Sequence, residues 1–271
     1  MPDKTEQPSS LAITKRVAEL LEHGVAAVVI TVTCGANVGA KLLVDEFGER
    51  SGSLGATDLD SLVMPQVSKF LQSRDETRLV SVKDFAADYP AASETFLLFE
   101  RLQPSPRLVV CGAGHVGASL AKLGAFLGYQ TTLIDDRAEF LQSDRFANEA
   151  IELVVASDWS SAVRARVGNG RGVSVAVVTR GHSEDEQCMR AVIETQPDYV
   201  GLIGSKRRTT IVIDRLREAG ASEEELRKIR APIGLDIGAV SPEEVAVAII
   251  AEIVAERRGA AGGSLSAWRR K

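Results

Sequence analysis

The sequence has few cysteines, and their spacing excludes two kinds of site. Cys34, Cys111 and Cys188 are the three cysteines among 271 residues, and they lie far apart with no C-x-x-C pair. Isolated cysteines in odd number predict neither a disulfide framework nor a zinc cage, so we expect no metal site. Unpaired thiols are typical of a reducing compartment, and we therefore expect a cytoplasmic protein.

The sequence also lacks an excess of basic residues and long apolar runs. Its formal net charge is −5 at pH 7, whereas a general nucleic-acid binder usually has a basic domain. Apolar runs such as residues 25–32 are too short to span a bilayer, and residues 1–10 lack the apolar segment of a signal peptide. We therefore expect a soluble globular chain with no nucleic-acid partner and no membrane partner.

A proline-containing stretch at residues 103–106 predicts a domain boundary. Pro104 and Pro106 disfavour a helix there and stiffen the chain. We therefore expect a smaller N-terminal α/β domain over residues 1–103 and a second domain over residues 104–271. In the first domain, apolar periodicity predicts helices over residues 11–23 and from residue 57, and strands over 25–33, 41–45, 78–82 and 95–100.

In the second domain, strands and helices alternate regularly. This alternation predicts an α/β fold with a Rossmann-like, doubly wound parallel sheet. Capping boxes that begin at Ser222 and Ser241 predict the starts of two further helices. Strands are expected over residues 108–111, 131–135, 152–156, 173–179 and 199–203, and helices over 116–127, 184–195 and 206–219.

A glycine-rich turn after the first of these strands has the pattern of a dinucleotide-binding site. Gly112, Gly114 and Gly117 form G-x-G-x-x-G between an apolar strand and a predicted helix. The first glycine permits a tight turn, the second admits a pyrophosphate, and the third allows close packing of helix on strand. His115 and Val116 would stand at the helix start, where N–H groups attract anions. The alternative is a tight turn without a ligand.

The end of the next strand carries two acids and an arginine. Asp135 follows the glycine turn at the spacing of the acid that binds ribose hydroxyls in dinucleotide sites. Asp136 and Arg137 come directly after it. Because an arginine at this place could instead serve a 2′-phosphate, the identity of the nucleotide stays open.

A second polar cluster follows the fourth strand. Arg180 and His182 lie there, and Asp185 follows within one turn. Ligands gather beyond the carboxyl ends of parallel strands, so these residues are candidates for the same site. His182 with Asp185 could transfer a proton or hold a polar ligand, or His182 could be a structural hydrogen-bonding residue.

A third cluster follows the fifth strand and begins a helix with positive charge. Gly204 and Ser205 precede Lys206, Arg207 and Arg208. Cations in the first turn oppose the helix dipole, at a cost of roughly 0.3–1 kcal/mol each when exposed. A bound phosphate at the helix start would reverse this cost, so we predict an anion site. The alternative is a solvated basic turn.

The run from Pro232 to Gly238 is apolar and interrupted by glycines. Gly234 could line a ligand loop with backbone groups, or the run could be the turn before the last helix. Asp236 is an acid among apolar neighbours, and we expect such an acid to need a partner.

With these residues in view, the chain resembles the XdhC/CoxI family of xanthine dehydrogenase accessory factors. The resemblance is strongest from Pro104 to about Arg257 and depends on several unrelated segments in the same order. These segments cover residues 108–117, 134–137, 145–146, 179–182, 199–207, 232–238 and 241–244.

The resemblance implies a maturation factor for a molybdenum enzyme. Such proteins bind molybdenum cofactor (molybdopterin), support its sulfuration and deliver it to a xanthine dehydrogenase-type molybdenum hydroxylase apoenzyme. A sulfur-donating desulfurase is then a further partner, and a homo-oligomer is compatible with the family. On this basis we expect a non-catalytic, cofactor-binding accessory protein whose site residues come from the clusters above.

The N-terminal part departs from the family pattern. Residues 39–41 keep Gly-Ala-Lys, but the Pro-Arg pair before them and the Ser-Gly-Gly-Cys-like loop after them are missing. Cys34 is the one N-terminal thiol that could take part in molybdenum or sulfur chemistry. The alternative, which we favour, is a small buried residue at a strand end. An NAD(P)-dependent oxidoreductase and a nucleotide-sensing module remain alternatives. No Tyr-x-x-x-Lys pair follows the glycine turn, so an oxidoreductase would have to use His182 with Asp185.

Overall fold

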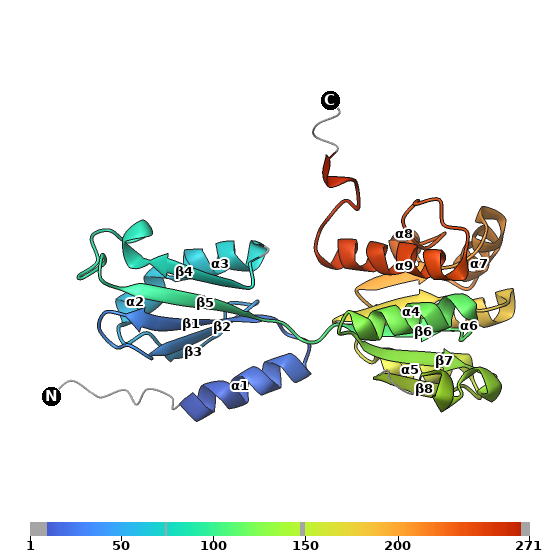
Figure 1. The fold of residues 1–271 in the computed structure, drawn as a ribbon, viewed down its shortest axis with the longest axis horizontal. Coiled ribbons are helices and arrows are strands. Elements are labelled where there is room, and N and C mark those ends of the chain that lie inside the picture. The colour runs from blue at the N-terminus through green and yellow to red at the C-terminus, as the bar shows by residue number, and fades with distance from the viewer. Residues whose placement is uncertain (1–9, 74, 147–149, 267–271) are drawn as a thin grey trace. The chain divides into compact units, whose positions relative to one another are not determined.

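The structure is a computed structural model that describes residues 10–73, 75–146 and 150–266 (Figure 1). The chain divides into two compact units, with the boundary between Pro104 and Ser105. Within the described residues, none of the helices has both the length and the apolar composition needed to cross a membrane.

The N-terminal unit is a five-stranded antiparallel sheet in the order β3-β2-β1-β5-β4. Helix α1 packs on one face of the sheet, and α2 and α3 pack on the other. The strands are β1 Ala27–Cys34, β2 Lys41–Asp45, β3 Arg50–Ser53, β4 Thr77–Ser81 and β5 Phe96–Leu102. The helices are α1 Ser10–Glu22, α2 Thr57–Leu62 and α3 Met64–Gln72, and a short 3₁₀ turn, η1, covers Val82–Asp84.

The two faces of β1 explain why its sequence is a continuous apolar run. Val28 and Ile30 point to the core under α2 and α3, whereas Ala27 and Val29 point to the core under α1. Successive strand residues alternate between faces, so a strand covered on both sides is apolar throughout.

The single helix predicted from residue 57 is wrong in detail, because two helices meet at Val63. Asp60 lies in the first turn of α2. Its carboxylate accepts a hydrogen bond from the Leu54 N–H at 2.7 Å and so ties the preceding loop to α2.

The C-terminal unit is a six-stranded, all-parallel sheet in the order β11-β10-β9-β6-β7-β8. This is the strand order of a dinucleotide-binding Rossmann domain, and it confirms the predicted doubly wound α/β fold. The chain order reverses between β6 and β9, which are direct neighbours. The strands are β6 Arg107–Cys111, β7 Gln130–Asp135, β8 Ile151–Val155, β9 Val173–Val177, β10 Tyr199–Leu202 and β11 Ile229–Arg230.

Helices cover both faces of this sheet (Figure 1). Helices α4 (His115–Phe126) and α9 (Pro242–Arg257) share one core, and the remaining helices share the other. Strand β6 serves both cores, with Leu108 and Val110 on one face and Val109 and Cys111 on the other. The helices of the second face are α5 Trp159–Val167, α6 His182–Thr195, α7 Lys206–Glu218 and α8 Glu223–Lys228.

Local signals locate some elements better than others. Both predicted capping boxes are formed, Ser222 with Glu225 before α8 and Ser241 with Glu244 before α9. Strand β11 has two residues and was not predicted, because so short a run carries no periodicity. The segment between β7 and β8 contains the 3₁₀ turns η2 (Ala138–Phe140) and η3 (Ser143–Arg145).

Candidate functional site

The glycine turn joins the carboxyl end of β6 to α4, at the point where the strand order reverses. Gly112 has φ +114°, and a Cβ there would lie 2.6 Å from the Val178 carbonyl oxygen. A Cβ at Gly117 would lie 1.7 Å from the Gly112 carbonyl oxygen, so neither position accepts a side chain. At Gly114, by contrast, a Cβ would meet nothing within 4 Å. The backbone at Gly114 therefore faces open space.

Helix α4 begins at this open position. Gly114 is its N-cap residue and supplies no side-chain hydrogen bond. His115 is exposed at the first helical position, and Val116 behind it is partly buried. The first turn of α4 thus presents its N–H groups and the positive end of the helix dipole at the carboxyl end of β6, and such a helix start is a favourable place for an anion.

Asp135, the predicted ribose acceptor, is engaged inside the protein. It is 1% exposed, and it accepts hydrogen bonds from the Ala113 N–H at 2.7 Å and the Arg137 N–H at 3.0 Å. The Arg137 guanidinium donates two more, at 2.9 and 3.0 Å, and stacks 3.8 Å from the Phe140 ring centre. Asp135 therefore holds the glycine turn against β7, and the roles expected for Asp135 on ribose and for Arg137 on a 2′-phosphate do not fit this arrangement.

Asp136 is the accessible acid of this pair, and it contacts another loop. Its carboxylate accepts two hydrogen bonds from the Arg180 guanidinium, at 2.7 and 2.9 Å. Arg180 also lies 3.2 Å from Glu184. Hydrogen bonds from Arg180 lower the pKa of Asp136 to about 2. Arg180 follows β9 and Asp136 follows β7, so the pair joins loops on either side of β6.

Asp185 has a structural partner, which the sequence did not predict. It is 0% exposed and accepts hydrogen bonds from the Thr179 hydroxyl at 2.6 Å and from Arg208 at 2.9 and 2.5 Å. Burial raises the pKa of Asp185, although Thr179 and Arg208 oppose the rise. His182 is exposed at the start of α6. Both oxygens of this buried carboxylate therefore have donors other than His182, and a proton-transfer role for His182 with Asp185 stays a prediction.

The same contact changes the interpretation of the basic helix start. Ser205 is the N-cap of α7 and accepts a hydrogen bond from the Arg208 N–H at 3.3 Å. Because Arg208 is paired with Asp185, its charge needs no external anion. Lys206 and Arg207 are exposed and form no ion pair with the described residues. Gly204, which precedes this helix start, has φ +147°. Within the described residues, the start of α7 therefore has two unpaired cations, Lys206 and Arg207, rather than the three predicted.

The predicted Gly234 loop approaches the end of β10 but is fixed by backbone contacts. The Ile233 N–H donates to the Leu202 carbonyl at 3.0 Å. The Gly234 N–H donates to Glu252 at 2.9 Å, and the Tyr199 hydroxyl donates to the same carboxylate oxygen at 2.5 Å. Asp236 is exposed. Water can therefore solvate its carboxylate, and the expectation that it needs a protein partner is wrong.

Cys34 ends β1 in the other unit and is exposed, so the expectation of a buried residue is also wrong. Cys111 and Cys188 are buried. Among the residues that the structure describes, no group of three His, Cys, Asp or Glu side chains is arranged to hold a metal ion.

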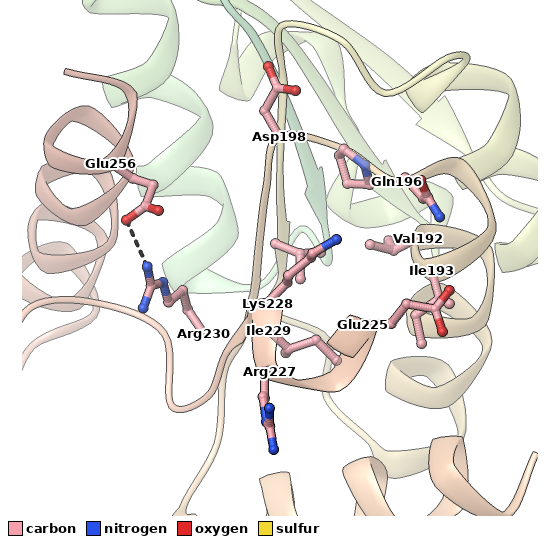
Figure 2. A pocket seen from close by; sticks show the side chains of 12 residues that line it. Val192, Ile193, Gln196, Asp198, Glu225, Arg227, Lys228, Ile229, Arg230 and Glu256 are labelled. Atoms are coloured by element: carbon pink, nitrogen blue, oxygen red, sulfur yellow. Dashed lines mark hydrogen bonds and ion pairs between the residues drawn. The ribbon is translucent and has the colours of Figure 1, made fainter. Parts of the chain in front are cut away.

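A cavity of about 380 Å³ lies away from the glycine turn (Figure 2). Its lining comes from the carboxyl end of α6, the amino ends of β10 and β11, and α8. Arg230 and Glu256 form a 2.9 Å ion pair on one side of it. None of the predicted site residues lines this cavity, so it belongs to the opposite edge of the sheet.

The family model of the XdhC Rossmann domain matches residues 108–253, more than half of the chain. The chain belongs to the XdhC family. The match covers the glycine turn, the Asp136–Arg180 pair and the start of α7. It confirms the family that the sequence motifs indicated.

Curated relatives agree with this assignment, and a solved structure shares the fold. The chain is 29% identical over 83% of its length to the uncharacterized protein YqeB of Escherichia coli, and 28% identical over 60% to a probable xanthine dehydrogenase subunit of Bacillus subtilis. It is 36% identical over 26% of its length to the molybdenum cofactor insertion chaperone PaoD of Escherichia coli. The chain spans 41%, 47% and 22% of these relatives, less than half of each.

A crystal structure described as a xanthine dehydrogenase from Bacillus halodurans has the same fold. It superposes with a TM-score of 0.66 at 18% identity, over 93% of this chain and 68% of that one. At this identity the likeness concerns the fold alone.

Proposed function

We propose that this XdhC family member is an accessory factor in the maturation of a xanthine dehydrogenase-type molybdenum enzyme. In this role it binds molybdenum cofactor as cargo, as the pterin phosphate or its dinucleotide form, and passes it to the apoenzyme. The relatives named a molybdenum cofactor insertion chaperone and a probable xanthine dehydrogenase subunit support this assignment. The client enzyme is the proposed partner, with a sulfur-donating desulfurase as a second.

The observation that carries the proposal is the open, uncapped start of α4 together with two exposed cations. The N–H groups of His115, Val116 and Gly117 lie at a helix start whose N-cap supplies no side-chain acceptor. Lys206 and Arg207 begin α7, the helix that follows β10 at the same sheet edge. N–H groups and cations are the donors that a phosphate requires. This donor set fits the phosphate end of the cargo, and we propose that Gly112, Gly114 and Arg180 complete it.

The other predicted residues take supporting roles in this proposal. Asp135 and Arg137 hold the glycine turn, and Ser205 with Gly204 orients the start of α7. We also propose that residues 1–103 form the XdhC/CoxI-like N-terminal domain and residues 104–271 the Rossmann-like domain. His182, Gly234 and Asp236 stay candidates at the carboxyl edge, for contacts with the pterin end or with the client.

Direct binding tests the proposal. The purified chain is titrated with molybdenum cofactor released from a molybdenum enzyme, and separately with NADH and NADPH, and the complexes are weighed by native mass spectrometry. We expect a complex with the pterin. Tight binding and turnover of a nicotinamide nucleotide without pterin binding would contradict the proposal and favour an oxidoreductase.

A charge-matched pair of variants tests the site. Replacing both Lys206 and Arg207 with Ala should weaken pterin binding by about tenfold, which corresponds to ~1.4 kcal/mol. The control replaces Arg227 and Lys228, two exposed cations that line the distant cavity. Equal losses in both double variants would show that net charge, not this site, governs binding.

Gly114→Ala is a second site variant. The added methyl group meets no protein atom within 4 Å, so we expect a cost of at most about 1 kcal/mol at the N-cap. It should nevertheless weaken pterin binding, because it occupies the space through which a phosphate reaches the backbone. Unchanged pterin affinity in a folded Gly114→Ala variant would show that the cofactor does not bind at this turn.

A further inference from the structure

The contact between Asp136 and Arg180 crosses the end of β6. Cys111, the last residue of β6, is level with Ile134 in β7 and Val177 in β9. Asp136 follows β7 and Arg180 follows β9, so the two loops flank the glycine turn. Neighbouring strands lie about 4.8 Å apart, so β7 and β9, on either side of β6, are separated by about 10 Å. The ion pair therefore bridges the carboxyl end of the strand that carries the turn.

We propose that the Asp136–Arg180 pair is a latch over the glycine turn, and that a phosphate group of the ligand opens it by replacing the Asp136 carboxylate on Arg180. This inference rests on the phosphate site proposed above. It assigns Arg180 as the residue that changes partner on binding and Asp136 as the competitor that sets the affinity.

Arg137 cannot exchange its carboxylate partner for a phosphate in this way. Three donors of Arg137 are used by Asp135, which is 1% exposed, and its guanidinium is stacked on Phe140. Moving Arg137 would leave a buried carboxylate without its cation, and such a loss is costly.

Arg180, in contrast, can move at small cost. Its side chain is 46% exposed and that of Asp136 is 30% exposed. Exposed ion pairs contribute little because water replaces either partner. Asp136 accepts two parallel hydrogen bonds from this guanidinium. A phosphate presents the same pair of acceptor oxygens, with more charge.

Acid is not the trigger of this latch. The pKa of Asp136 is held at about 2 by its hydrogen bonds from Arg180. The carboxylate therefore stays ionised in neutral solution, and a competing anion is needed to release Arg180.

The test uses inorganic pyrophosphate as the probe and isothermal titration calorimetry on the full chain. Asp136→Asn removes the carboxylate that accepts two hydrogen bonds from Arg180 and leaves the single Glu184 contact in place. We expect pyrophosphate to bind about two- to fivefold more tightly, the range of an exposed ion pair. Arg180→Gln should weaken binding relative to wild type. Glu194→Gln is the control, because it removes one negative charge from another exposed ion pair, with Arg164; it should leave the affinity unchanged.

Amide hydrogen exchange supplies a reading that does not need a ligand. Asp136→Asn should speed exchange in residues 112–117 and 178–182 of the free protein, and Glu194→Gln should not. Thermal unfolding checks that each variant is folded.

The results distinguish a failure of the latch from a failure of the proposed phosphate site. Equal pyrophosphate affinity of wild type and Asp136→Asn, with weaker binding by Arg180→Gln, would overturn the latch and leave the phosphate site intact. An equal gain in Asp136→Asn and Glu194→Gln would overturn the latch in favour of general charge. Absence of pyrophosphate binding in all variants would overturn the phosphate site and the latch together.

Discussion

Two aspartate–arginine pairs connect neighbouring elements at the carboxyl edge of the parallel sheet, and they differ in burial. Asp185 is 0% exposed and its partner Arg208 is 23% exposed, whereas Asp136 and Arg180 are 30% and 46% exposed. The buried pair joins α6 to α7, and the exposed pair joins the loops after β7 and β9. A buried charge cannot lose its partner cheaply, but an exposed one can exchange it for water or a ligand. The Asp185–Arg208 pair therefore fixes the positions of α6 and α7, whereas the Asp136–Arg180 pair can open at smaller cost.

Removal of Arg208 should have the largest effect on stability. Arg208→Ala leaves the buried Asp185 carboxyl group with only the Thr179 hydroxyl as a partner, so we expect a loss of about 3 kcal/mol in the free energy of unfolding. Urea unfolding measures it. The adjacent Arg207→Ala is the control and should change stability by less than about 0.5 kcal/mol, because Arg207 is exposed. A small loss for Arg208→Ala would mean that the buried pair does not fix the positions of α6 and α7.

Asp135→Asn should have an intermediate effect. The amide keeps the shape and can still accept from the Ala113 N–H, but it loses the charge that holds Arg137, so we expect a loss of about 1–3 kcal/mol. The neighbouring Asp136→Asn makes the same chemical change at an accessible position. If both variants lost equal stability by urea unfolding, burial would not distinguish these two acids.

Arg180→Gln should cost little stability. An exposed pair contributes about 0.2–1 kcal/mol, and salt screens it. The difference between wild type and Arg180→Gln in urea unfolding should therefore shrink as the salt concentration rises. A loss as large as that of Arg208→Ala would contradict the exchangeable role of Arg180.

The smallest expected effect is the pH dependence of the stability that Asp136 contributes. The pKa of Asp136 in the folded chain is about 2, below its ordinary value of 3.8, so the ionised pair stabilises the fold above the ordinary value. This contribution is lost as the pH falls through about 2. The difference in unfolding free energy between wild type and Asp136→Asn should therefore be present above the ordinary pKa and shrink as the pH falls through about 2. A difference that persisted unchanged in strong acid would show that the Asp136 charge is not its source.

The fold of the C-terminal unit was largely readable from local sequence. The glycine turn, the strands before and after it, and the capping boxes at Ser222 and Ser241 are short-range patterns, and each occurs where it was predicted. Such patterns depend on neighbouring residues alone, because backbone sterics and helix ends act over a few positions. The two residues of β11 were missed for the same reason, since their pairing with β10 is a tertiary contact.

The sequence predicted which loops carry the candidate site residues, but it did not predict which charged side chains pair with one another. Arg208 lies 23 positions from Asp185 and Arg180 lies 44 positions from Asp136, and nothing in the sequence links them. The basic start of α7 therefore counted as three unpaired cations, whereas the structure uses one of them internally. Exposure was equally unreadable at Asp236 and Cys34, which are both accessible to water.

By itself, the sequence determined the family, the Rossmann-like alternation and the glycine turn with its space at Gly114, because these depend on residue type and spacing along the chain. Only the tertiary structure decided which charges are already neutralised. Folding brings Asp135, Asp136 and Asp185 beside arginines from their own or neighbouring loops, and burial then determines which of these pairs can open. The carboxyl edge of the sheet thus combines a buried aspartate–arginine pair with an exposed one that joins the loops on either side of the glycine turn.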